Sequence, residues 1–434
     1  MSAEQSWSHV RLGDHATIKA RLGWKGLKAH EYRDGGSIFL ATPNIKDFEI
    51  DFRNVNHISE QRFTESAEIM LQVGDVLLVK DGSTLGISNL VRWLPAPTTI
   101  NGSIALLRCR GDLHPAFLHQ LTKAAAFQKL IQDKKSGLGV PHLFQADLRE
   151  FVIPLPPLSE QYRIVEILET LDETIRKTEQ VIAKLQQMKQ GLLHDLLTRG
   201  IDDNGELRDP EQNPGNFTDS HLGQIPSAWE VATFGDCLIS SPQNGLYKPS
   251  HHYGESGTPI VRIDGFYDGV MAPVSSLKRL GLTSAELDSF RLEQGDILIN
   301  RVNSIDFVGK AGLVPILSEP VVFESNIMRC RLSTDRLTPG FAIRWIIAPY
   351  SRKWFHRRAK SAIAQASVNQ TDVIELAIAL PPLDEQQRIV ERAEQAENRI
   401  DLEQRHLAKL RTLKHGLMDD LLTGRVRVTP DEAQ

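Results

Sequence analysis

Two long stretches of the chain repeat apolar side chains with a period of 3.5 residues. In residues 159–198 the apolar positions follow alternating steps of four and three, and the same frame returns in residues 384–423. A heptad pattern sustained this long predicts a supercoiled helix that needs a helical partner. The predicted seam positions are Ile164, Leu168, Leu171, Ile175, Ile182 and Leu185 in the first stretch and Ile389, Ile400, Leu407 and Leu410 in the second.

Proline sets the start of both predicted helices. The motif PPLSEQ at residues 156–161 returns as PPLDEQ at residues 381–386, and proline blocks a helix upstream. Ser159 and Asp384 then serve as N-caps, and a glycine follows the end of each stretch. At 1.5 Å per residue, each helix is roughly 60 Å long.

The seams favour a pairing of the two helices with each other. The first is rich in Leu and Ile where the second carries Ala393 and Ala396, so their volumes are complementary. Two equivalent units in one chain predict that the helices run antiparallel about a pseudo-twofold axis. The alternative, in which each helix lies along its own globular domain, fits a heptad of this length poorly.

The self-similarity extends beyond the helices. The proline motif recurs after 225 residues, Trp7 is matched by Trp229 after 222, and Gly74 is matched by Gly295 after 221. Two tandem copies with small insertions produce an offset that drifts in this way. The helical parts match well and the globular parts have diverged. We therefore expect the two helices to share one function and the two globular parts to perform two variants of another function.

Short apolar runs predict strands in both globular parts, and helical periods follow between Pro115 and Ile131 and between Pro339 and Ala359. The expected fold class is α+β, with two tandem α+β domains related by pseudo-twofold symmetry and separated by a long antiparallel two-helix coiled coil. The expected boundaries are 1–154 for the first domain, 155–200 for the first helix, 201–226 for a polar linker, 227–380 for the second domain, 381–427 for the second helix and 428–434 for a tail.

The composition, with 41% hydrophobic and 24% charged residues among 434, is that of a soluble globular protein without a membrane span. The first five residues are polar and acidic, which predicts no secretory signal. Three cysteines without a CxxC pair predict neither a disulfide framework nor a zinc site. Cys109 and Cys330 stand at equivalent positions in apolar runs, so we expect buried thiols in the cytoplasm.

The net charge of −5 is unevenly divided along the chain. Residues 1–154 carry 18 basic and 16 acidic side chains, whereas residues 201–226 carry six acids and one arginine. The globular parts are mildly basic and the acid lies in connectors and helices. Ordinary scatter between domains explains sums of this size equally well, so the local clusters carry more information.

The strongest basic cluster is residues 352–360, with five positive charges and no acid. Its aromatic pair, Trp354 and Phe355, would anchor a helix whose basic side chains reach DNA phosphates; a solvated helix face is the alternative. The counterpart, residues 123–135, is rich in lysine, and polar loops suited to base edges follow both clusters. Further candidates lie at the polar ends of two strands, each of which follows a Gly-Asp turn, and these ends differ between the two copies. The candidate DNA-binding residues are Lys80, Ser83, Lys134, Lys135, Ser136, Arg301, Asn303, Arg352, Lys353, Arg357, Arg358 and Lys360.

Catalytic signatures are missing from the sequence. It contains no P-loop, no HExxH and no GxSxG motif. His251 and His252 form an isolated pair without further ligands at metal-binding spacing, so we expect a solvated pair and no metal site. These observations favour a chain that recognises and positions over one that reacts.

The doubled motif Pro-Pro-Leu-x-Glu-Gln-x-x-Ile-Val, each time behind an α+β domain and at the start of a long helix, resembles the specificity subunit of type I restriction–modification systems. The resemblance covers essentially the whole chain. It implies two target-recognition domains, each of which reads one half of a bipartite double-stranded DNA sequence. It also implies that the two helices space these domains and dock partner subunits, and that the chain itself is not an enzyme.

The partners implied by the resemblance are two modification (methyltransferase) subunits and the restriction subunits, which translocate and cleave DNA. The cofactors S-adenosylmethionine, ATP and magnesium would belong to those subunits, and none would be bound by this chain. Two alternatives stay open from the sequence. One is a coiled-coil adaptor with ligand- or protein-binding end domains, and the other is a specificity chain of a system that methylates without cleaving.

Overall fold

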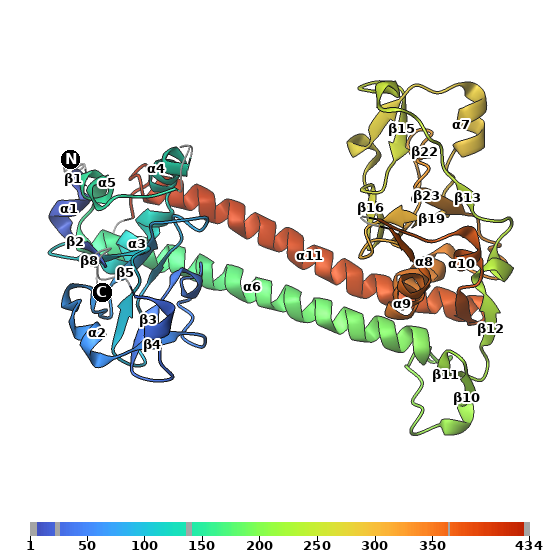
Figure 1. Ribbon diagram of the computed structural model, residues 1–434, viewed down its shortest axis with the longest axis horizontal. Helices are drawn as coiled ribbons and strands as arrows, with labels where there is room; N and C mark the ends of the chain where they lie inside the picture. Colours follow the sequence, from blue (N-terminus) through green and yellow to red (C-terminus); the bar gives the residue numbers. More distant parts are fainter. Residues whose placement is uncertain (1–6, 22–26, 136–140, 363–364, 429–434) are drawn as a thin grey trace. The chain divides into compact units, whose positions relative to one another are not determined.

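A computed structural model describes residues 7–21, 27–135, 141–362 and 365–428. The chain divides into two units, each built from one globular domain and parts of two long helices (Figure 1). Unit 1 comprises residues 1–182 and 403–434, and unit 2 comprises residues 183–402. None of the described helices is long and apolar enough to cross a membrane.

The two long helices are α6, Leu158–Thr198, and α11, Leu383–Leu421. Each begins one residue before the expected N-cap, so Ser159 and Asp384 lie inside the first turn and the expectation that they cap it is wrong. Pro157 directly precedes α6, and its carbonyl O accepts the backbone N–H groups of residues 160 and 161, both at 3.0 Å.

Left-handed glycines follow both helices. Gly200 has φ +64° and Gly424 has φ +74°, a conformation that favours glycine. Both lie against a tryptophan, because a Cβ at Gly200 would come within 2.5 Å of the Trp229 ring and one at Gly424 within 3.0 Å of Trp7. A larger residue at either position would therefore clash with the ring as well as strain the backbone.

Within each unit, the parts of α6 and α11 run antiparallel. In unit 1 Lys414 donates to Asp172, and Arg411 Nη2 lies 2.7 Å from Glu179 Oε1, so positions that rise along α6 meet positions that fall along α11. In unit 2 Lys189 Nζ lies 3.2 Å from Glu397 Oε1. The predicted seam side chains are buried at Ile164, Leu168, Ile175, Ile182, Ile389 and Ile400 and half-buried at Leu171, Leu185, Leu407 and Leu410.

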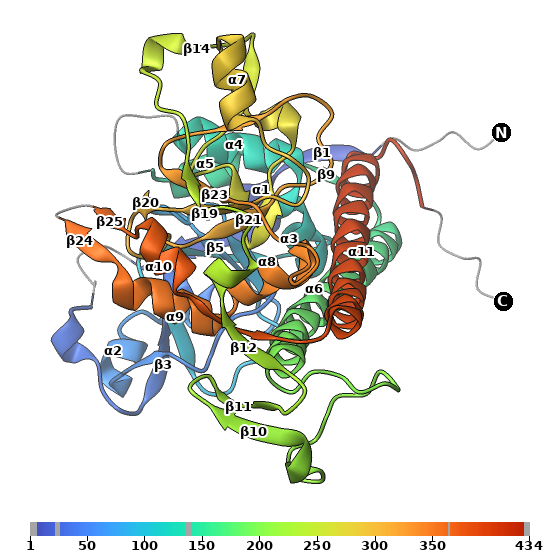
Figure 2. The ribbon, with the colours of Figure 1, turned by 90° about the vertical axis from the view of Figure 1, so that its right-hand side faces the viewer.

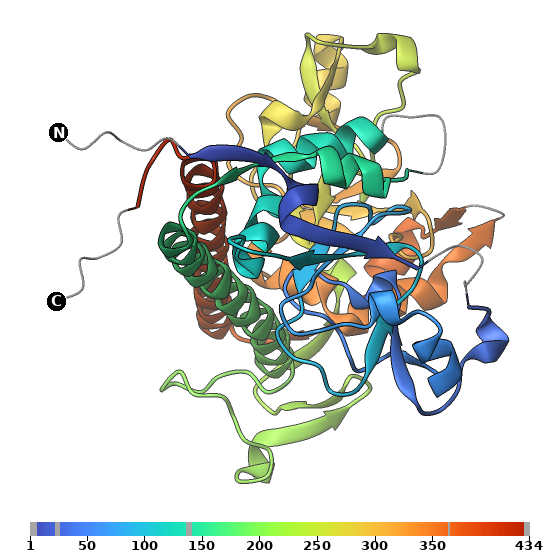
Figure 3. The same ribbon diagram turned by 90° about the vertical axis from the view of Figure 1, so that its left-hand side faces the viewer.

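The domain of unit 1 contains a four-stranded antiparallel sheet of order β2-β8-β5-β6, a three-stranded sheet β4-β3-β7 and the pair β1-β9 (Figure 3). The strands are β1 Ser8–Arg11, β2 Ala16–Ala20, β3 Ser37–Leu40, β4 Asn56–Ile58, β5 Val76–Val79, β6 Ser88–Leu90, β7 Thr98–Ile100, β8 Ile104–Cys109 and β9 Val152–Leu155. The helices are α1 Leu12–His15, α2 Glu60–Thr64, α3 Pro115–Lys123, α4 Ala125–Lys135 and α5 Gln145–Glu150.

The domain of unit 2 contains a six-stranded sheet of order β13-β23-β19-β21-β17-β16, a four-stranded sheet β14-β18-β15-β22, a three-stranded sheet β20-β25-β24 and the pair β12-β26 (Figure 2). The strands are β12 Glu230–Thr233, β13 Gln243–Asn244, β14 Tyr253–Gly254, β15 Thr258–Val261, β16 Phe266–Tyr267, β17 Gly269–Met271, β18 Lys278–Leu280, β19 Ile297–Asn300, β20 Val302–Asn303, β21 Ala311–Leu313, β22 Val322–Phe323, β23 Ile327–Cys330, β24 Lys360–Ala362, β25 Gln365–Ser367 and β26 Ala377–Leu380. The helices are α7 Ser284–Phe290, α8 Pro339–Ile347, α9 Pro349–Arg358 and α10 Gln370–Ile374.

The two domains share one framework. The closing pair β1-β9 corresponds to β12-β26, and the parallel pair β3-β7 corresponds to β15-β22. Helices α3 and α4 correspond to α8 and α9, so each predicted helical period is two helices rather than one. The break falls at Ala124 and Ala348, whose backbones are extended.

The segment predicted as a linker, residues 201–226, contains a β-hairpin. Strand β10, Phe217–Ser220, pairs antiparallel with β11, Gly223–Pro226. Ile225 is 3% exposed and belongs to the core that contains Trp229 and Leu197. The hairpin therefore packs on unit 2, a role that its polar composition did not indicate.

Candidate nucleic-acid interface

Each domain carries a polar edge where the strand after the Gly-Asp turn ends. The backbone N of Lys80, which follows β5, donates to Ser103 O at 2.8 Å. The backbone N of Arg301, which follows β19, donates to Asn326 O at 2.9 Å. The same hydrogen bond thus positions two unlike side chains, a lysine in unit 1 and an arginine in unit 2.

The edge of unit 1 is held together by charged pairs. Lys80 is 9% exposed and its Nζ donates to Asp81 Oδ2 at 3.0 Å, while the other carboxylate oxygen of Asp81 contacts His142 Nδ1. The backbone N of Leu143 donates to Lys80 O at 2.9 Å, so the chain returns beside this strand. Ser83 is exposed. Lys80 therefore acts mainly within the domain, and Ser83 is accessible to a ligand.

The lysines of α4 divide in the same way. Lys134 Nζ lies 2.9 Å from Asp147 Oδ1, whereas Lys135 is exposed and lines a groove of about 650 Å³ in unit 1. The predicted candidate Ser136 lies outside the described residues.

The edge of unit 2 continues from Arg301 onto a small sheet. Arg301 Nη1 donates to Ser325 O at 3.2 Å, and Asn303 lies on β20, where it pairs with Ala366 of β25. Lys360, at the start of β24, belongs to the same sheet and is exposed. Strands β20 and β25 and helices α9 and α10 are seen together in Figure 2.

The basic cluster on α9 separates into side chains that are paired within the domain and side chains that are not. Arg352 donates to the carbonyls of Val308 at 3.0 Å and Asp306 at 2.6 Å, and burial lowers the pKa of its guanidinium. Arg358 Nη1 lies 2.6 Å from Glu375 Oε2, and its Cζ is 4.3 Å from the centre of the Trp354 ring. These two arginines fix the helix within the domain.

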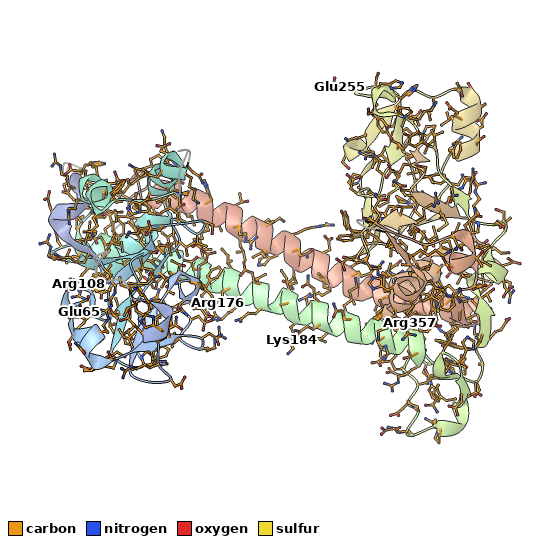
Figure 4. The ribbon with its side chains drawn as sticks, in the orientation of Figure 1. Glu65, Arg108, Arg176, Lys184, Glu255 and Arg357 are labelled. Carbon is orange, nitrogen blue, oxygen red and sulfur yellow. The ribbon has the colours of Figure 1, made fainter. Side chains whose placement is uncertain are left out.

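Lys353 and Arg357 are exposed on α9, and no described residue forms an ion pair with either of them. Figure 4 labels Arg357 on this helix. Together with Lys360 they form the accessible positive charge of this part of unit 2. Exposed cations of this kind are suited to contacts with DNA phosphates.

A buried junction in unit 1, absent from the sequence prediction, explains the glutamate of the repeated motif. Glu160 accepts from Trp7 Nε1 at 3.0 Å, from Arg427 Nε and Nη2 at 2.8 Å each and from Val428 N at 3.2 Å. The carboxylate thus joins the start of α6 to the start of the domain and to the chain beyond α11.

Unit 2 repeats this junction with the roles of the helices exchanged. Glu385 accepts from Trp229 Nε1 at 3.1 Å, from Arg208 Nη2 at 3.0 Å and from Ile201 N at 3.0 Å. Here the carboxylate at the start of α11 holds the chain beyond α6. The signal for these residues was present in the sequence, because the motif repeats after 225 residues and the tryptophan after 222.

The glutamine of the motif ties each long helix to a loop of its own domain. Gln161 Oε1 accepts from His114 N at 2.8 Å, and its Nε2 donates to Asp112 O at 2.8 Å. Gln386 Oε1 accepts from Thr338 N at 2.8 Å, and its Nε2 donates to Arg336 O at 2.8 Å. The motif therefore orients both domains on their helices in the same way.

A second matched junction lies farther along the helices. In unit 1 Gln120 Nε2 of α3 donates to Asp172 Oδ2 at 3.2 Å, and Lys414 of α11 contacts the same carboxylate. In unit 2 Arg344 Nη2 of α8 donates to Glu397 Oε2 at 2.8 Å, and Lys189 contacts that carboxylate. Lys414 and Lys189 therefore each take part in a contact that joins a domain to both long helices.

The described residues offer little to a chemical mechanism. They contain no group of three or more His, Cys, Asp or Glu side chains that could hold a metal ion. Burial raises the pKa of the Cys109 thiol to about 12 and raises that of Cys330 further, so neither forms a thiolate nucleophile near neutral pH. Burial lowers the pKa of His119 to about 3, which keeps that imidazole neutral.

The fold and the interface define a class of protein, one with two recognition domains that share a framework and differ at the polar edge. The family described as type I restriction modification DNA specificity domain matches the chain twice, at residues 4–187 and 226–412. The chain therefore belongs to this family.

Curated relatives match over nearly the whole chain. The type I restriction enzyme MjaVIII specificity subunit of Methanocaldococcus jannaschii is 25% identical, over 98% of this chain and 94% of its own length. The EcoKI specificity subunit of Escherichia coli is 24% identical, over 90% of this chain and 82% of its own length.

Among solved structures, the type I restriction–modification S subunit of M. genitalium has the same fold, with a TM-score of 0.56 and 15% identity over 97% of both chains. A chain from a study of the assembly of the type I R-M system has a TM-score of 0.58 and 19% identity, over 97% of this chain and 98% of that one.

Proposed function

We propose that each globular domain of this DNA-recognition subunit contacts one half of a two-part duplex target. The observation that carries the proposal is the repeated framework with unlike edges. Lys80 and Arg301 occupy one backbone position, yet the side chains and loops around them differ in charge and shape. Two domains with the same framework and different polar edges are suited to bind two different base sequences.

Affinity for the DNA backbone comes chiefly from the accessible cations. Lys353, Arg357 and Lys360 in unit 2 and Lys135 in unit 1 are exposed, whereas Lys134, Arg352 and Arg358 are tied to neighbours in the same domain. Phosphate contacts of this kind position a protein on the duplex without reading its sequence.

The partners are two modification subunits, one for each unit, together with restriction subunits. The matched junctions around Glu160 and Glu385 support this number, because they present a similar arrangement of domain and helices twice. S-adenosylmethionine, ATP and magnesium serve the chemistry of those partner subunits. This chain recognises the target sequence.

Mapping of methylated adenines tests the proposal. A host that expresses the chain with its modification subunits should carry methylation at a single two-part motif, and a host without the chain should carry none. The purified chain alone should transfer no methyl group from S-adenosylmethionine to DNA. Methylation independent of the chain, or a continuous motif without a spacer, would contradict the proposal.

A further inference from the structure

Unit 2 has a concave hollow beside its polar edge, with a volume of about 530 Å³. Ser325 and Asn326, which line it, also hold the backbone and side chain of Arg301. The hollow is therefore continuous with the candidate DNA interface, although none of its lining residues was predicted from the sequence. The remaining lining side chains that matter here are Tyr247, Ser250, Arg262, Lys278 and Glu324.

The guanidinium of Arg262 is hydrogen-bonded through Nε, whereas no described residue accepts from its two Nη groups. Its Nε donates to Glu324 Oε2 at 3.2 Å, and its Cζ lies 5.8 Å from the centre of the Tyr253 ring. Glu324 is 8% exposed, and its second oxygen accepts from Ile263 N at 2.6 Å. No described residue accepts a hydrogen bond from the Nη1 or Nη2 group of Arg262, whose side chain is 34% exposed. The guanidinium thus offers two parallel donors in a fixed orientation.

Cationic side chains outnumber carboxylates around the hollow. Lys278 is exposed and no described acidic side chain pairs with it, and Tyr247, Ser250 and Asn326 add neutral donors. The one carboxylate among the lining residues, Glu324, already accepts from Arg262 and Ile263. A tetrahedral oxyanion can accept hydrogen bonds from several directions, whereas a base edge presents one or two acceptors in a plane.

The arginine of the hollow has no counterpart at the matching position of unit 1. The parallel pair β15-β22 places Arg262 and Glu324 directly after Val261 and Phe323, and the backbone N of Glu324 donates to Val261 O at 3.0 Å. In unit 1 the backbone N of Asn101 donates to Leu40 O at 2.9 Å, so the matching residues there are Ala41 and Asn101. The same scaffold position carries an arginine clamp in unit 2 and a small apolar residue in unit 1.

We propose that this hollow is a phosphate site, in which Arg262 binds one phosphodiester of the DNA backbone through Nη1 and Nη2 and Lys278 supports it. The proposal rests on the proposed DNA-recognition function and adds an anchor whose arginine is replaced by Ala41 at the matching position of unit 1. The contact fixes unit 2 against the duplex beside Arg301 and carries no base information.

The test uses the complete modification complex and compares Arg262→Ala, Lys278→Ala and the control Arg279→Ala. Arg279 is the neighbour of Lys278 on β18, but it pairs with Glu319 and does not line the hollow. The affinity for target and for non-target duplex is measured across a range of salt concentrations. Arg262→Ala should weaken both by the same factor and lower the log–log salt slope by about 0.9. Lys278→Ala should act in the same direction, and Arg279→Ala should leave the slope unchanged.

Methylation mapping and a competition arm complete the test. The methylated motif should be identical for Arg262→Ala and the parent chain. A motif relaxed at one base pair would overturn the proposal in favour of a base-reading arginine. Unchanged DNA affinity would overturn it too. In that case, calorimetric binding of inorganic phosphate to the parent but not to Arg262→Ala would show that the hollow takes free phosphate. If the parent complex itself shows no sequence preference, the proposed function fails as well.

Discussion

Two glutamates hold together parts of the chain that are far apart in sequence. Glu160 and Glu385 each accept from a tryptophan of the domain that precedes them and from an arginine beyond the opposite long helix. Both side chains are nearly inaccessible, at 5% and 3% exposed. A buried carboxylate is stable only when its oxygens are saturated with donors, so the tryptophan and the arginine are required by the glutamate.

Replacement of Arg427 should therefore destabilise unit 1. Arg427→Ala removes two of the four hydrogen bonds to Glu160, and loss of donors to a buried carboxylate costs about 1–3 kcal/mol of unfolding free energy. Hydrogen exchange should rise at the end of α11 and at the start of α6. The control is Arg425→Ala, which removes the exposed pairs with Asp419 and Asp420. Equal effects of the two variants would show that the junction contributes nothing.

The same region should lose stability in acid. Burial disfavours the charged form of Glu160, but the bonds from Arg427, Trp7 and Val428 outweigh it, so its pKa lies below the ordinary 4.5. For Asp172, burial is likewise outweighed, mainly by Lys414, and its pKa lies below 3.8. Because both folded-state pKa values are depressed, the stabilisation is complete above the ordinary values and is lost as the pH falls through the lowered ones.

Unfolding of unit 1 measured between pH 7 and pH 3 should therefore show a stability that is flat above about pH 5 and falls below it. Asp172→Asn removes one of the carboxylates with a lowered pKa and should make the fall shallower. A stability that rises on acidification, or an Asp172→Asn variant with the same slope as the parent, would contradict this assignment.

At the scale of single elements, α9 shows how one run of basic residues divides its roles. Arg352 and Arg358 contact carbonyls, a carboxylate and a tryptophan of the same domain, whereas Lys353 and Arg357 face solvent. The sequence predicts the cluster but not this division, because the hydrogen-bond partners of Arg352 and Arg358 lie 17 to 46 residues away.

Arg357→Ala should lower the log–log salt slope of DNA binding by about 0.9, because it removes an accessible phosphate contact. Arg358→Ala should leave the slope unchanged and instead lower the unfolding midpoint, because it removes the contacts with Trp354 and Glu375. Salt titrations and thermal unfolding of the two variants provide the comparison. A slope that falls equally in both would mean that Arg358 leaves its partners to reach the duplex.

The elements that the sequence predicts best are those with a repeated signal. The heptads and the prolines predict α6 and α11 to within a residue at the start, since both are local patterns of many positions. The hairpin β10-β11 was missed because its strands are short and largely polar, and they bury only Ile225 and Pro226. The hollow around Arg262 was missed because its walls come from several separate segments, with Glu324 62 residues from Arg262, and no local pattern brings them together.

At the scale of the whole molecule, each domain is closed by a strand pair next to its long helix. Glu230 of β12 lies opposite Leu380 of β26, just as Ser8 of β1 lies opposite Leu155 of β9. The two ends of a domain are therefore neighbours and leave the chain at a fixed distance. A domain can be exchanged at these points without a change in the helices or in the junctions around Glu160 and Glu385, because Trp7 and Trp229 lie outside the exchanged segments.

Replacement of residues 230–380 by the equivalent domain of a relative should change one half of the methylated motif and leave the other half intact. The joint at Glu230 and Leu380 keeps Trp229, so the junction with Glu385 and Arg208 is preserved and the chimera should assemble with its partners. The reciprocal exchange of residues 8–155 should change the opposite half. Methylated adenines mapped in hosts that express each chimera give the result directly. If one exchange altered both halves, the domains would read the target jointly, and the repeated framework would not reflect two independent readers.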